Sequence, residues 1–372
     1  MKSFDEIFID KTKYGVKVQT SEYSELGEHI IIDQGQSQIA GYTDREEGLF
    51  EEVPVIVFGD HTRIIKYVDK PFFLGADGVK VLRSKDENAN YKYLYYALKN
   101  AKIPNTGYNR HFKWLKNIQI NYPTVEKQAE IVAILDKVSS VIRKREDELS
   151  VLDDLIKARF VEMFGDSVAN PMKWPIKKLK DLSVQINSGN TPKGGSENYV
   201  EEGITFFRSQ NVWKDRLEMD DIAYIDLKTH ARMKRSSLKH GDILMTKTGR
   251  INTENSSLGR AALYMGQDDM ANVNGHVYFI RLKEGVNNKF ILRILVSPEY
   301  RDLIRRVCVG GIDKRQLNKE HIEDFPIICP PKDMIDEYVS FVDQIDKSKA
   351  AVQKSLDETQ MLFDSLMQEY FG

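Results

Sequence analysis

The sequence predicts an α+β protein in which two long helices separate two globular domains and form an intramolecular antiparallel coiled coil. Three observations lead to this fold class. A segment in the middle of the chain recurs at its end without a gap, and two stretches of about forty residues lack helix breakers. Elsewhere, short β-like runs alternate with glycine-rich turns and short helical segments.

The repeat relates residues 115–165 to residues 322–372. Pro123 corresponds to Pro330, so the offset is 330 − 123 = 207 residues. The same offset relates Leu115/Ile322, Ile118/Phe325, Ile120/Ile327, Asp136/Asp343, Leu149/Leu356, Leu155/Leu362 and Phe164-Gly165/Phe371-Gly372. One module, a domain followed by a long helix, therefore occurs twice.

The two long segments are predicted to be helices because neither proline nor glycine interrupts residues 124–164 or 332–371. About forty helical residues span roughly 60 Å at 1.5 Å per residue. Apolar residues recur at heptad positions a and d, which is typical of a coiled coil. In the second segment they are Ile335, Val342, Leu356, Phe363 and Tyr370 at a, with Tyr338, Ile345, Val352 and Leu366 at d. In the first they are Leu135, Ile142, Leu149, Ile156 and Met163 at a, with Ile131, Val138 and Leu152 at d.

Lys349 and Arg145 interrupt this seam, and polar seam residues often fix the register at some cost in stability. Two unrelated core helices are the simpler alternative, but core helices rarely reach ten turns. Since the helices connect the domains in series, antiparallel packing within one chain would place one domain at each end. Pairing between chains is the other arrangement that the pattern allows.

The globular parts are predicted at residues 1–122 and 166–328, with the long helices at 123–165 and 329–372. In the first domain we expect strands at 30–32, 53–58 and 79–82 and a helix at 91–99. In the second we expect strands at 204–207, 222–225, 242–245 and 277–282, and helices at 288–296 and 299–306.

Composition excludes several classes of protein. A net charge of −2 argues against a surface covered in phosphate-binding cations, and it is compatible with local basic patches. Cys308 and Cys329 are the only cysteines, so no disulfide framework is implied and a reducing cytoplasm is expected. The start of the chain does not resemble a signal peptide, and no apolar run approaches the ~18 residues of a membrane span.

No motif in the sequence predicts catalysis. Walker A and G-x-G-x-x-G patterns, and the C-x-x-C and H-x-x-x-H spacings of metal sites, do not occur. Asp60 and His61 are adjacent in a loop, where such a pair more often forms a turn than a catalytic site. We therefore predict a non-catalytic chain that binds no cofactor or metal itself.

Polar, basic and glycine-rich loops occur in both domains and carry the side chains that read base edges and approach phosphates. Solvated loops are the simpler interpretation of any single residue, but one such set occurs in each copy of the repeat. The candidate DNA-binding residues are His61, Arg63, Lys66, Asn109, Arg110 and Lys113 in the first domain. In the second they are Asn190, Lys193, Lys247, Thr248, Arg250, Asn252, Arg260, Lys314 and Arg315.

Both long segments are led by proline and have aromatic-glycine ends, at 122–165 and 330–372, and the second domain contains Ser188-Gly-Asn-Thr-Pro192, Gly241-Asp-Ile-Leu244 and Lys247-Thr-Gly249. In these features the chain resembles the specificity subunit of Type I restriction-modification enzymes, and its second domain resembles the target-recognition domain of that family. The first domain is similar to another variant of the target-recognition domain, on the segments Val57-Phe-Gly-Asp-His-Thr-Arg63 and Gly75-Ala-Asp-Gly-Val-Lys80.

The resemblance implies that each target-recognition domain reads one half of a bipartite sequence in double-stranded DNA. It also implies that the coiled coil sets the spacer and docks two copies of a DNA methyltransferase subunit, which uses S-adenosylmethionine to methylate adenine. A separate motor-nuclease subunit would use ATP and Mg²⁺. The alternatives are a protein–protein scaffold without a DNA role, a fused enzyme, and a specificity subunit of a methylation-only system.

Overall fold

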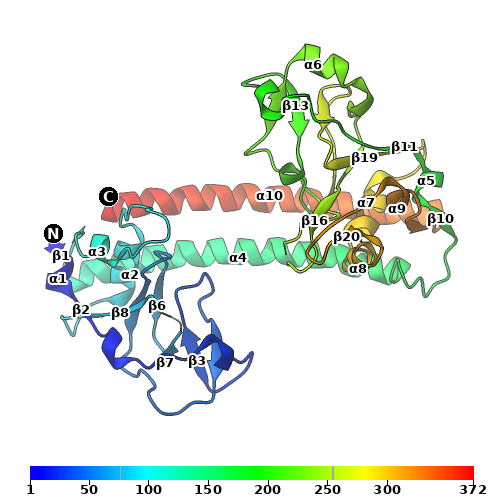
Figure 1. Ribbon diagram of the computed structural model, residues 1–372. Helices are drawn as coiled ribbons and strands as arrows, with labels where there is room; N and C mark the ends of the chain where they lie inside the picture. Colours follow the sequence, from blue (N-terminus) through cyan, green and yellow to red (C-terminus); the bar gives the residue numbers. More distant parts are fainter. Residues whose placement is uncertain (76, 254) are drawn as a thin grey trace. The chain divides into compact units, whose positions relative to one another are not determined.

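The structure is a computed structural model that describes residues 1–75, 77–253 and 255–372. It divides into two compact units, Met1–Ser150 with Ala350–Gly372, and Val151–Lys349. Each unit contains one globular domain and a part of each long helix (Figure 1). The α+β fold class that the sequence predicts is therefore confirmed.

The long helices are α4 (Val125–Phe164) and α10 (Lys332–Phe371), each of 40 residues, as the absence of breakers predicts. The hydroxyl of Thr124 accepts a hydrogen bond from the backbone N–H of Lys127 at 3.4 Å and caps the start of α4. Gly165 follows α4 with a φ of 74°, a left-handed conformation that favours glycine at a helix end.

The helices pack antiparallel, as predicted. In the first unit, Ile131 and Leu135 near the start of α4 share a buried cluster with Phe363 near the end of α10. In the second unit, Ile156 near the end of α4 shares a cluster with Val342 near the start of α10. All of the predicted seam residues are buried or half-buried. The buried ones are Ile131, Leu135, Ile156, Met163, Tyr338, Val342, Val352 and Phe363, and the half-buried ones are Val138, Ile142, Leu149, Leu152, Ile335, Ile345, Leu356, Leu366 and Tyr370.

The apolar stripe is wider than the predicted two residues per heptad. Phe160, Phe164 and Met367 are also buried because these parts of the helices pack against the globular domains as well as against each other. At the polar seam position in the second unit, the Lys349 Nζ lies 2.6 Å from the Asp153 Oδ1 on the facing helix. The heptad pattern therefore describes the helix pair but not its contacts with the domains.

The described residues of the first globular domain form two small sheets. The larger has the antiparallel order β2-β8-β5-β6 and the smaller the order β4-β3-β7, in which β3 and β7 run parallel. A further pair, β1-β9, joins the start of the chain to the segment before α4. The bounds are β1 Lys2–Ser3, α1 Phe4–Ile7, β2 Phe8–Asp10, β3 His29–Ile32, β4 Gly41–Thr43, β5 Val55–Gly59, β6 Ile65–Val68, β7 Phe72–Leu74, β8 Val79–Ser84, α2 Tyr91–Lys99, α3 Phe112–Leu115 and β9 Gln119–Ile120, with 3-10 turns η1 Thr12–Tyr14 and η2 Thr20–Glu22.

In the described part of the second domain there are three sheets, ordered β11-β19-β15-β17, β12-β14-β13-β18 and β16-β21-β20, and the pair β10-β22. The bounds of its strands are β10 Ile176–Lys178, β11 Ser183–Ser188, β12 Tyr199–Val200, β13 Ile204–Phe207, β14 Ala223–Ile225, β15 Ile243–Thr246, β16 Thr248–Arg250, β17 Ala261–Leu263, β18 Ala271–Val273, β19 Val277–Leu282, β20 Val309–Gly310, β21 Lys314–Gln316 and β22 Pro326–Ile328. Its helices are α5 Leu179–Leu182, α6 Leu227–Arg232, α7 Asn288–Val296, α8 Pro298–Val307 and α9 Lys319–Glu323, with 3-10 turns η3 Gly195–Asn198, η4 Ser209–Asn211 and η5 Lys234–Ser236. The expected strands and helices of both domains are confirmed within two residues.

The repeat extends into the globular domains. In the first unit, the Lys92 Nζ on α2 lies 2.5 Å from the Asp136 Oδ2 on α4. In the second unit, Lys289 on α7 forms the same ion pair with Asp343 on α10. The lysines are 289 − 92 = 197 residues apart and the aspartates 343 − 136 = 207. The second copy therefore has ten more residues between this helix and the long helix.

Among the described residues, none of the helices combines the length and the apolar character that crossing a membrane requires.

Candidate nucleic-acid interface

The fold of the first domain brings together its two predicted basic segments, the turn after β5 and the segment before α3. The backbone N–H of His111 donates to the Asp60 carbonyl oxygen at 2.7 Å. The backbone N–H of Phe112 donates to the Asp60 Oδ1, also at 2.7 Å. Asp60 and His111 are buried, so this connection is part of the core. Since the Asp60 carboxylate caps a helix, the structure supports the turn interpretation of Asp60-His61.

His61 and Tyr108 form an aromatic pair on this joined surface. Their ring centroids are 4.6 Å apart and the rings are inclined by 8°, which is a stacked arrangement. No partner within the described part of the chain satisfies the buried His61 Nδ1. Arg63 has a φ of 63° and donates from Nη1 to the Ile103 carbonyl oxygen at 3.3 Å, which ties the turn to the same segment.

Three further predicted residues of the first domain, Asn109, Arg110 and Lys113, are exposed on the segment before α3 and at its start. The Lys113 ammonium lies 4.2 Å from the centroid of the Trp114 ring. Together with His61 and Arg63, they define what we call the first contact set. It offers cationic and amide groups of the kinds that bind phosphates and base edges.

Lys66 does not belong to this set, and its prediction as a DNA contact is not supported. Lys66 is 2% exposed. The ammonium donates to the Asp33 Oδ1 at 3.3 Å and to the Ser37 carbonyl oxygen at 2.6 Å. Burial lowers the pKa of Lys66, and the Asp33 carboxylate opposes this effect. The charge of Lys66 is used inside the domain because β6 directs it inward.

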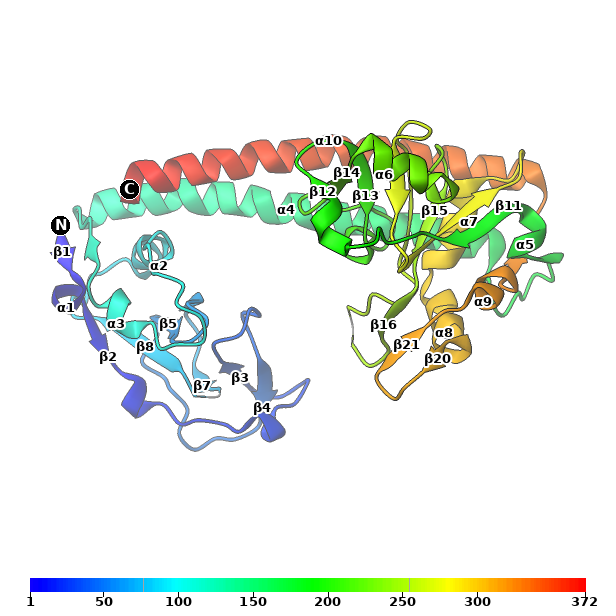
Figure 2. The ribbon, with the colours of Figure 1, turned by 45° about the horizontal axis from the view of Figure 1, so that its top comes forward.

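The second domain joins the corresponding segments in the same way. The backbone N–H of Leu317 donates to the Lys247 carbonyl oxygen at 2.9 Å, as that of His111 does to Asp60 in the first domain. The contact is more extensive here because the extra residues of the second copy form strands. Strand β16 pairs with β21, with Arg250 opposite Lys314, and β21 pairs with β20. Figure 2 shows these three strands extending from the rest of the second domain beside α8.

An open pocket of about 430 Å³ lies between this sheet and the loop that follows β16. It brings together three predicted residues, Thr248, Arg250 and Lys314, with polar residues that the sequence analysis missed. The missed residues are Ser209, Thr253, Ser256 and Ser257, and Asn255 also lines the pocket. Ser209 comes from a part of the sequence distant from the other lining residues. The serine and threonine residues of the loop form no pattern that singles them out.

Gly249 shapes this pocket. A Cβ atom at Gly249 would lie 2.3 Å from the backbone nitrogen of Leu258, closer than real contacts allow. The adjacent Ser257 hydroxyl donates to the Thr248 carbonyl oxygen at 2.8 Å. The glycine in Thr248-Gly249-Arg250 is therefore required because two backbone segments approach closely.

Arg260 is the second correction to the predicted residues. It is 8% exposed, and its guanidinium carbon lies 3.8 Å from the centroid of the Trp213 ring. Its Nε donates to the Ser256 carbonyl oxygen at 3.0 Å, and its Nη2 donates to the Asn255 carbonyl oxygen. Burial, and then the nearby charge of Arg301, lowers its pKa from that of a free arginine. Arg260 therefore holds the pocket loop, and in this structure it does not present its charge to a ligand.

Four predicted residues lie on β21 or next to β16. Lys314 and Asn252 are exposed, Arg315 and Lys247 are half-exposed, and the Lys247 ammonium lies 5.8 Å from the centroid of the Tyr278 ring. With Thr248 and Arg250, they form what we call the second contact set.

The loop that carries Asn190 and Lys193 packs against the turn between β18 and β19. The backbone N–H of Asn190 donates to the Val273 carbonyl oxygen at 3.2 Å. Gly189 has no space for a Cβ atom, which would lie 1.9 Å from the same oxygen. Asn190 is half-exposed and Lys193 exposed. The His276 carbonyl oxygen in the same turn accepts a hydrogen bond from the backbone N–H of Lys247 at 2.8 Å, which connects this loop to the second contact set.

Several exposed side chains near these sets are not among the candidate DNA-binding residues. Tyr108 and Ile312 are large and almost fully exposed, and Arg305 and Arg306 lie exposed at the end of α8, next to β20. The helical period of residues 298–307 could have indicated the arginines, since their positions fall opposite the buried Tyr300 and Ile304.

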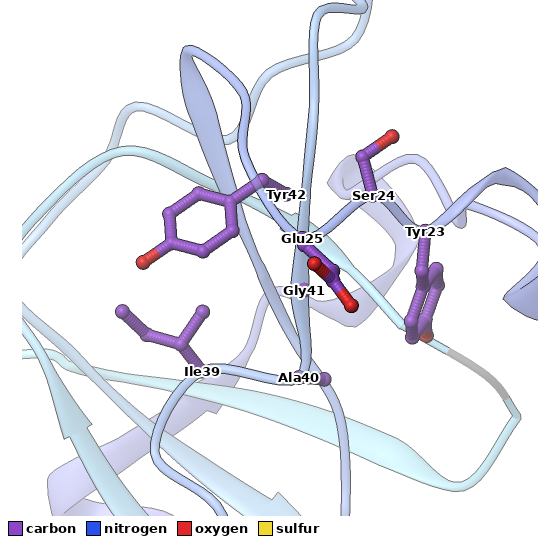
Figure 3. Close-up of a pocket in the computed structure, with 7 residues that line it drawn as sticks. All are labelled: Tyr23, Ser24, Glu25, Ile39, Ala40, Gly41 and Tyr42. Atoms are coloured by element: carbon purple, nitrogen blue, oxygen red, sulfur yellow. The ribbon is translucent and has the colours of Figure 1, made fainter. Parts of the chain in front are cut away.

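A second open pocket, of about 440 Å³, lies in the first domain beside β4 (Figure 3). Tyr23, Glu25, Ile39 and Tyr42 are among the residues that line it, and Glu25 is its only charged residue. A carboxylate repels phosphate, so this pocket is not suited to DNA. No cluster of potential metal ligands occurs among the residues that the structure describes.

The fold defines a class of protein. The structure of the S subunit of a Type I restriction-modification system from M. genitalium matches with a TM-score of 0.58 and 16% identity, covering 100% of this chain and 95% of that chain. A chain from a structure titled for complex assembly and conformational transition of the type I R-M system matches with a TM-score of 0.50 and 16% identity, covering 100% and 99%. At these identities the likeness concerns the fold, which is that of a specificity subunit.

The family model described as the Type I restriction modification DNA specificity domain matches residues 11–151 and 171–359. The chain therefore belongs to this family, and the resemblance drawn from the sequence is confirmed. The specificity subunit of the Type I restriction enzyme EcoR124I/EcoR124II from Escherichia coli is 30% identical over 153 residues. That match spans 38% of this chain and 37% of the relative, well under two thirds of its length.

Proposed function

We propose that this chain is the non-catalytic DNA-recognition subunit of a Type I restriction-modification complex, and that each globular domain reads one half of a bipartite target. The observation that carries the proposal is the repeated construction of the two contact sets. In each domain, the backbone of the residue after a central strand, Asp60 or Lys247, holds the basic segment that precedes the helix leading to α4 or α10. Two reading surfaces of the same design suit a target with two separate halves.

In this proposal the second contact set binds both phosphates and bases. Arg250 and Lys314 face each other across β16 and β21 and line a pocket rich in hydroxyl groups. Arginine and lysine bind guanine or phosphate, and serine and threonine hydroxyls bind either. The family to which the chain belongs does not favour a protein–protein scaffold without a DNA role.

We further propose that the coiled coil sets the spacer between the half-sites and docks two copies of the methyltransferase subunit. Each helix has 40 residues, which corresponds to about 60 Å at 1.5 Å per residue. The methyltransferase would supply S-adenosylmethionine-dependent adenine methylation, and a motor-nuclease subunit would supply ATP- and Mg²⁺-dependent cleavage. This chain would supply the address in DNA.

The first test is adenine methylation mapping in cells that express this chain with its methyltransferase subunit. We expect a split motif of two short halves around a fixed gap, which disappears when the chain is removed. Salt titration of DNA binding by the complex provides a second measurement. Phosphate contacts give a steep negative dependence of the logarithm of the affinity on the logarithm of the salt concentration. Absence of the motif with an active methyltransferase, and a flat salt dependence, would contradict the proposal.

The spacer role is tested by removing one heptad from each long helix, residues 143–149 and 353–359. Each helix then shortens by about 7 × 1.5 ≈ 10 Å, the length of about three base pairs. We expect the mapped gap to change or methylation to be lost. Alanine at the exposed residues Arg143 and Gln353 provides the control of unchanged length. A shortened, folded chain that methylates with the original gap would refute the spacer role.

The contact role is tested with Arg250→Ala and Lys247→Ala, using duplexes that differ from the target by single base pairs. Loss of a base-reading side chain should cost about 1–3 kcal/mol and relax one position, whereas loss of a phosphate contact should weaken all sequences evenly. Lys228→Ala, on α6 at the other end of the same domain from β16 (Figure 1), is the matched control. If the Arg250 and Lys247 variants bind as the control does, neither side chain contacts DNA in the complex.

A further inference from the structure

The turn between β20 and β21 holds a large apolar side chain in solvent. Ile312 is 90% exposed and contributes to none of the buried clusters among the described residues. A single exposed apolar residue is common on proteins and needs no explanation by itself. Its surroundings and its recurrence give it significance here.

The turn is held in place by the cations around it. The Arg315 Nε donates to the Gly311 carbonyl oxygen at 3.2 Å. The Arg250 Nε lies 3.2 Å from the Asp313 Oδ2, and the backbone N–H of Ile251 donates to the Asp313 carbonyl oxygen at 3.0 Å. These contacts attach the turn to β16 as well as to its own strands. Ile312 is therefore presented on a supported ribbon.

The charge around Ile312 indicates the kind of partner that covers it. Arg250, Lys314 and Arg315 lie on the paired strands, and Asp313 is the one acidic residue between Val309 and Gln316. Asp313 pairs with Arg250, so it does not neutralise Lys314 and Arg315, and the net charge of the ribbon is positive. An apolar tip within a cationic ribbon suits a polyanion that also offers an apolar group. A protein or lipid partner with a neutral surface would not require the positive charge of the ribbon.

The first domain has the same feature in the same segment of the repeat. Tyr108 is 86% exposed and lies seven residues before Leu115, which is the repeat counterpart of Ile322. Ile312 lies ten residues before Ile322. Tyr108 is followed by Asn109 and Arg110, which are also exposed. Two segments of different sequence and conformation thus each present one large apolar side chain among cations.

We propose that Ile312 packs against the C5-methyl group of a thymine in the major groove and makes recognition depend on that methyl group. This inference rests on the proposed function. A two-stranded β-ribbon fits the major groove, and the thymine methyl is the apolar group that the base edges present there. Isoleucine has no side-chain donor or acceptor, so it selects by apolar contact. It would disfavour a base whose polar edge it would separate from water.

The test uses the complex of this chain with its methyltransferase subunit and duplexes that carry the mapped target. Each thymine on both strands is replaced in turn by deoxyuridine, which pairs identically and lacks only the methyl group. For the wild-type complex, we expect one replacement to weaken binding roughly four- to tenfold, the loss of about one buried methyl contact. Ile312→Ala should weaken binding to the unmodified duplex to a similar extent and should then be indifferent to that replacement.

Two controls separate this contact from general effects. Val309→Ala removes a partly exposed apolar side chain from the same ribbon and should keep the full response to deoxyuridine. Ile312→Ala should leave the salt dependence of binding unchanged, whereas Lys314→Ala should reduce its slope if Lys314 binds a phosphate. Since Ile312 lies outside the core, Ile312→Ala should fold as the wild type does.

The outcomes distinguish this inference from the function on which it rests. If the complex methylates a split target but no deoxyuridine replacement weakens binding, the contact with a thymine methyl is refuted and the recognition role stands. The same conclusion follows if Ile312→Ala responds to every replacement as the wild type does. If the complex shows no sequence-specific binding or methylation, the proposed function itself fails.

Discussion

Replacement of Arg260 by alanine should loosen the loop that forms the polar pocket of the second domain. Arg260 makes hydrogen bonds to the carbonyl oxygens of Asn255 and Ser256 and stacks on Trp213. A hydrogen bond to a charged group contributes about 1.5–3 kcal/mol, and a desolvated cation–π contact contributes about 2 kcal/mol. The cost of burying the guanidinium offsets part of this sum. We therefore expect a net local loss of about 2–4 kcal/mol.

Hydrogen exchange of the backbone amides measures this loss directly. The amide of Leu258 is hydrogen-bonded to the Ser256 hydroxyl in the loop, and the amide of Gly259 to the carbonyl oxygen of Thr246 at the end of β15. A loss of 2–4 kcal/mol corresponds to a fall in their protection of roughly 30- to 1000-fold if they exchange through opening of the loop. DNA binding by the assembled complex should weaken for all sequences because the whole pocket loses its support.

Arg216→Ala is the matched control. Its guanidinium carbon lies 5.4 Å from the centroid of the same Trp213 ring, and it pairs with Glu218, but its side chain is exposed. We expect little change in protection, since exposed ion pairs contribute about 0–1 kcal/mol. Unchanged protection in Arg260→Ala, together with relaxed recognition at one base pair, would refute the supporting role and restore Arg260 as a base-reading residue.

Three further predictions concern stability. Lys349→Leu should stabilise the helix pair by about 1 kcal/mol, because leucine extends the apolar seam while Asp153 stays accessible to water. Thermal unfolding of the wild type and the variant measures this change, and a lower melting temperature of the variant would contradict the prediction. Burial raises the pKa of Tyr93 from 10.0 to about 12. Its contribution to stability should therefore be present below pH 10 and be lost as the pH rises towards 12. Tyr93→Phe should remove this loss of stability at alkaline pH, as measured by urea unfolding at a series of pH values. Phe164→Ala should cost about 3–5 kcal/mol and its repeat counterpart Phe371→Ala clearly less, since Phe164 is fully buried and Phe371 is not; equal losses in denaturant titrations would contradict this.

Much of the fold could be predicted because it depends on patterns that local physics interprets directly. The 207-residue offset, the long segments without proline or glycine and the apolar period all lie in the sequence itself. The seam residues Leu135 and Val342 are buried for this reason. The antiparallel pairing followed from connectivity, and the structure confirms it within each unit.

The candidate site could be predicted as segments but not as individual residues. Lys66 and Arg260 have the same chemical character as Arg250 and Lys314, yet the first two are buried and the last two are exposed. Lys66 lies on a strand that turns it towards Asp33, and Arg260 meets Trp213, which lies 47 residues earlier, since 260 − 213 = 47. Contacts between such distant residues are absent from any local pattern.

The sequence by itself thus determined the twofold module, the helix pair and the family of the chain, because repetition and periodicity are properties of residue order. Only the tertiary structure decided which cations are available to a ligand, and that Ile312 and Tyr108 extend into solvent beside them. The physical reason is burial: a charged or apolar side chain gains its role from what covers it, and the covering residues come from elsewhere in the chain.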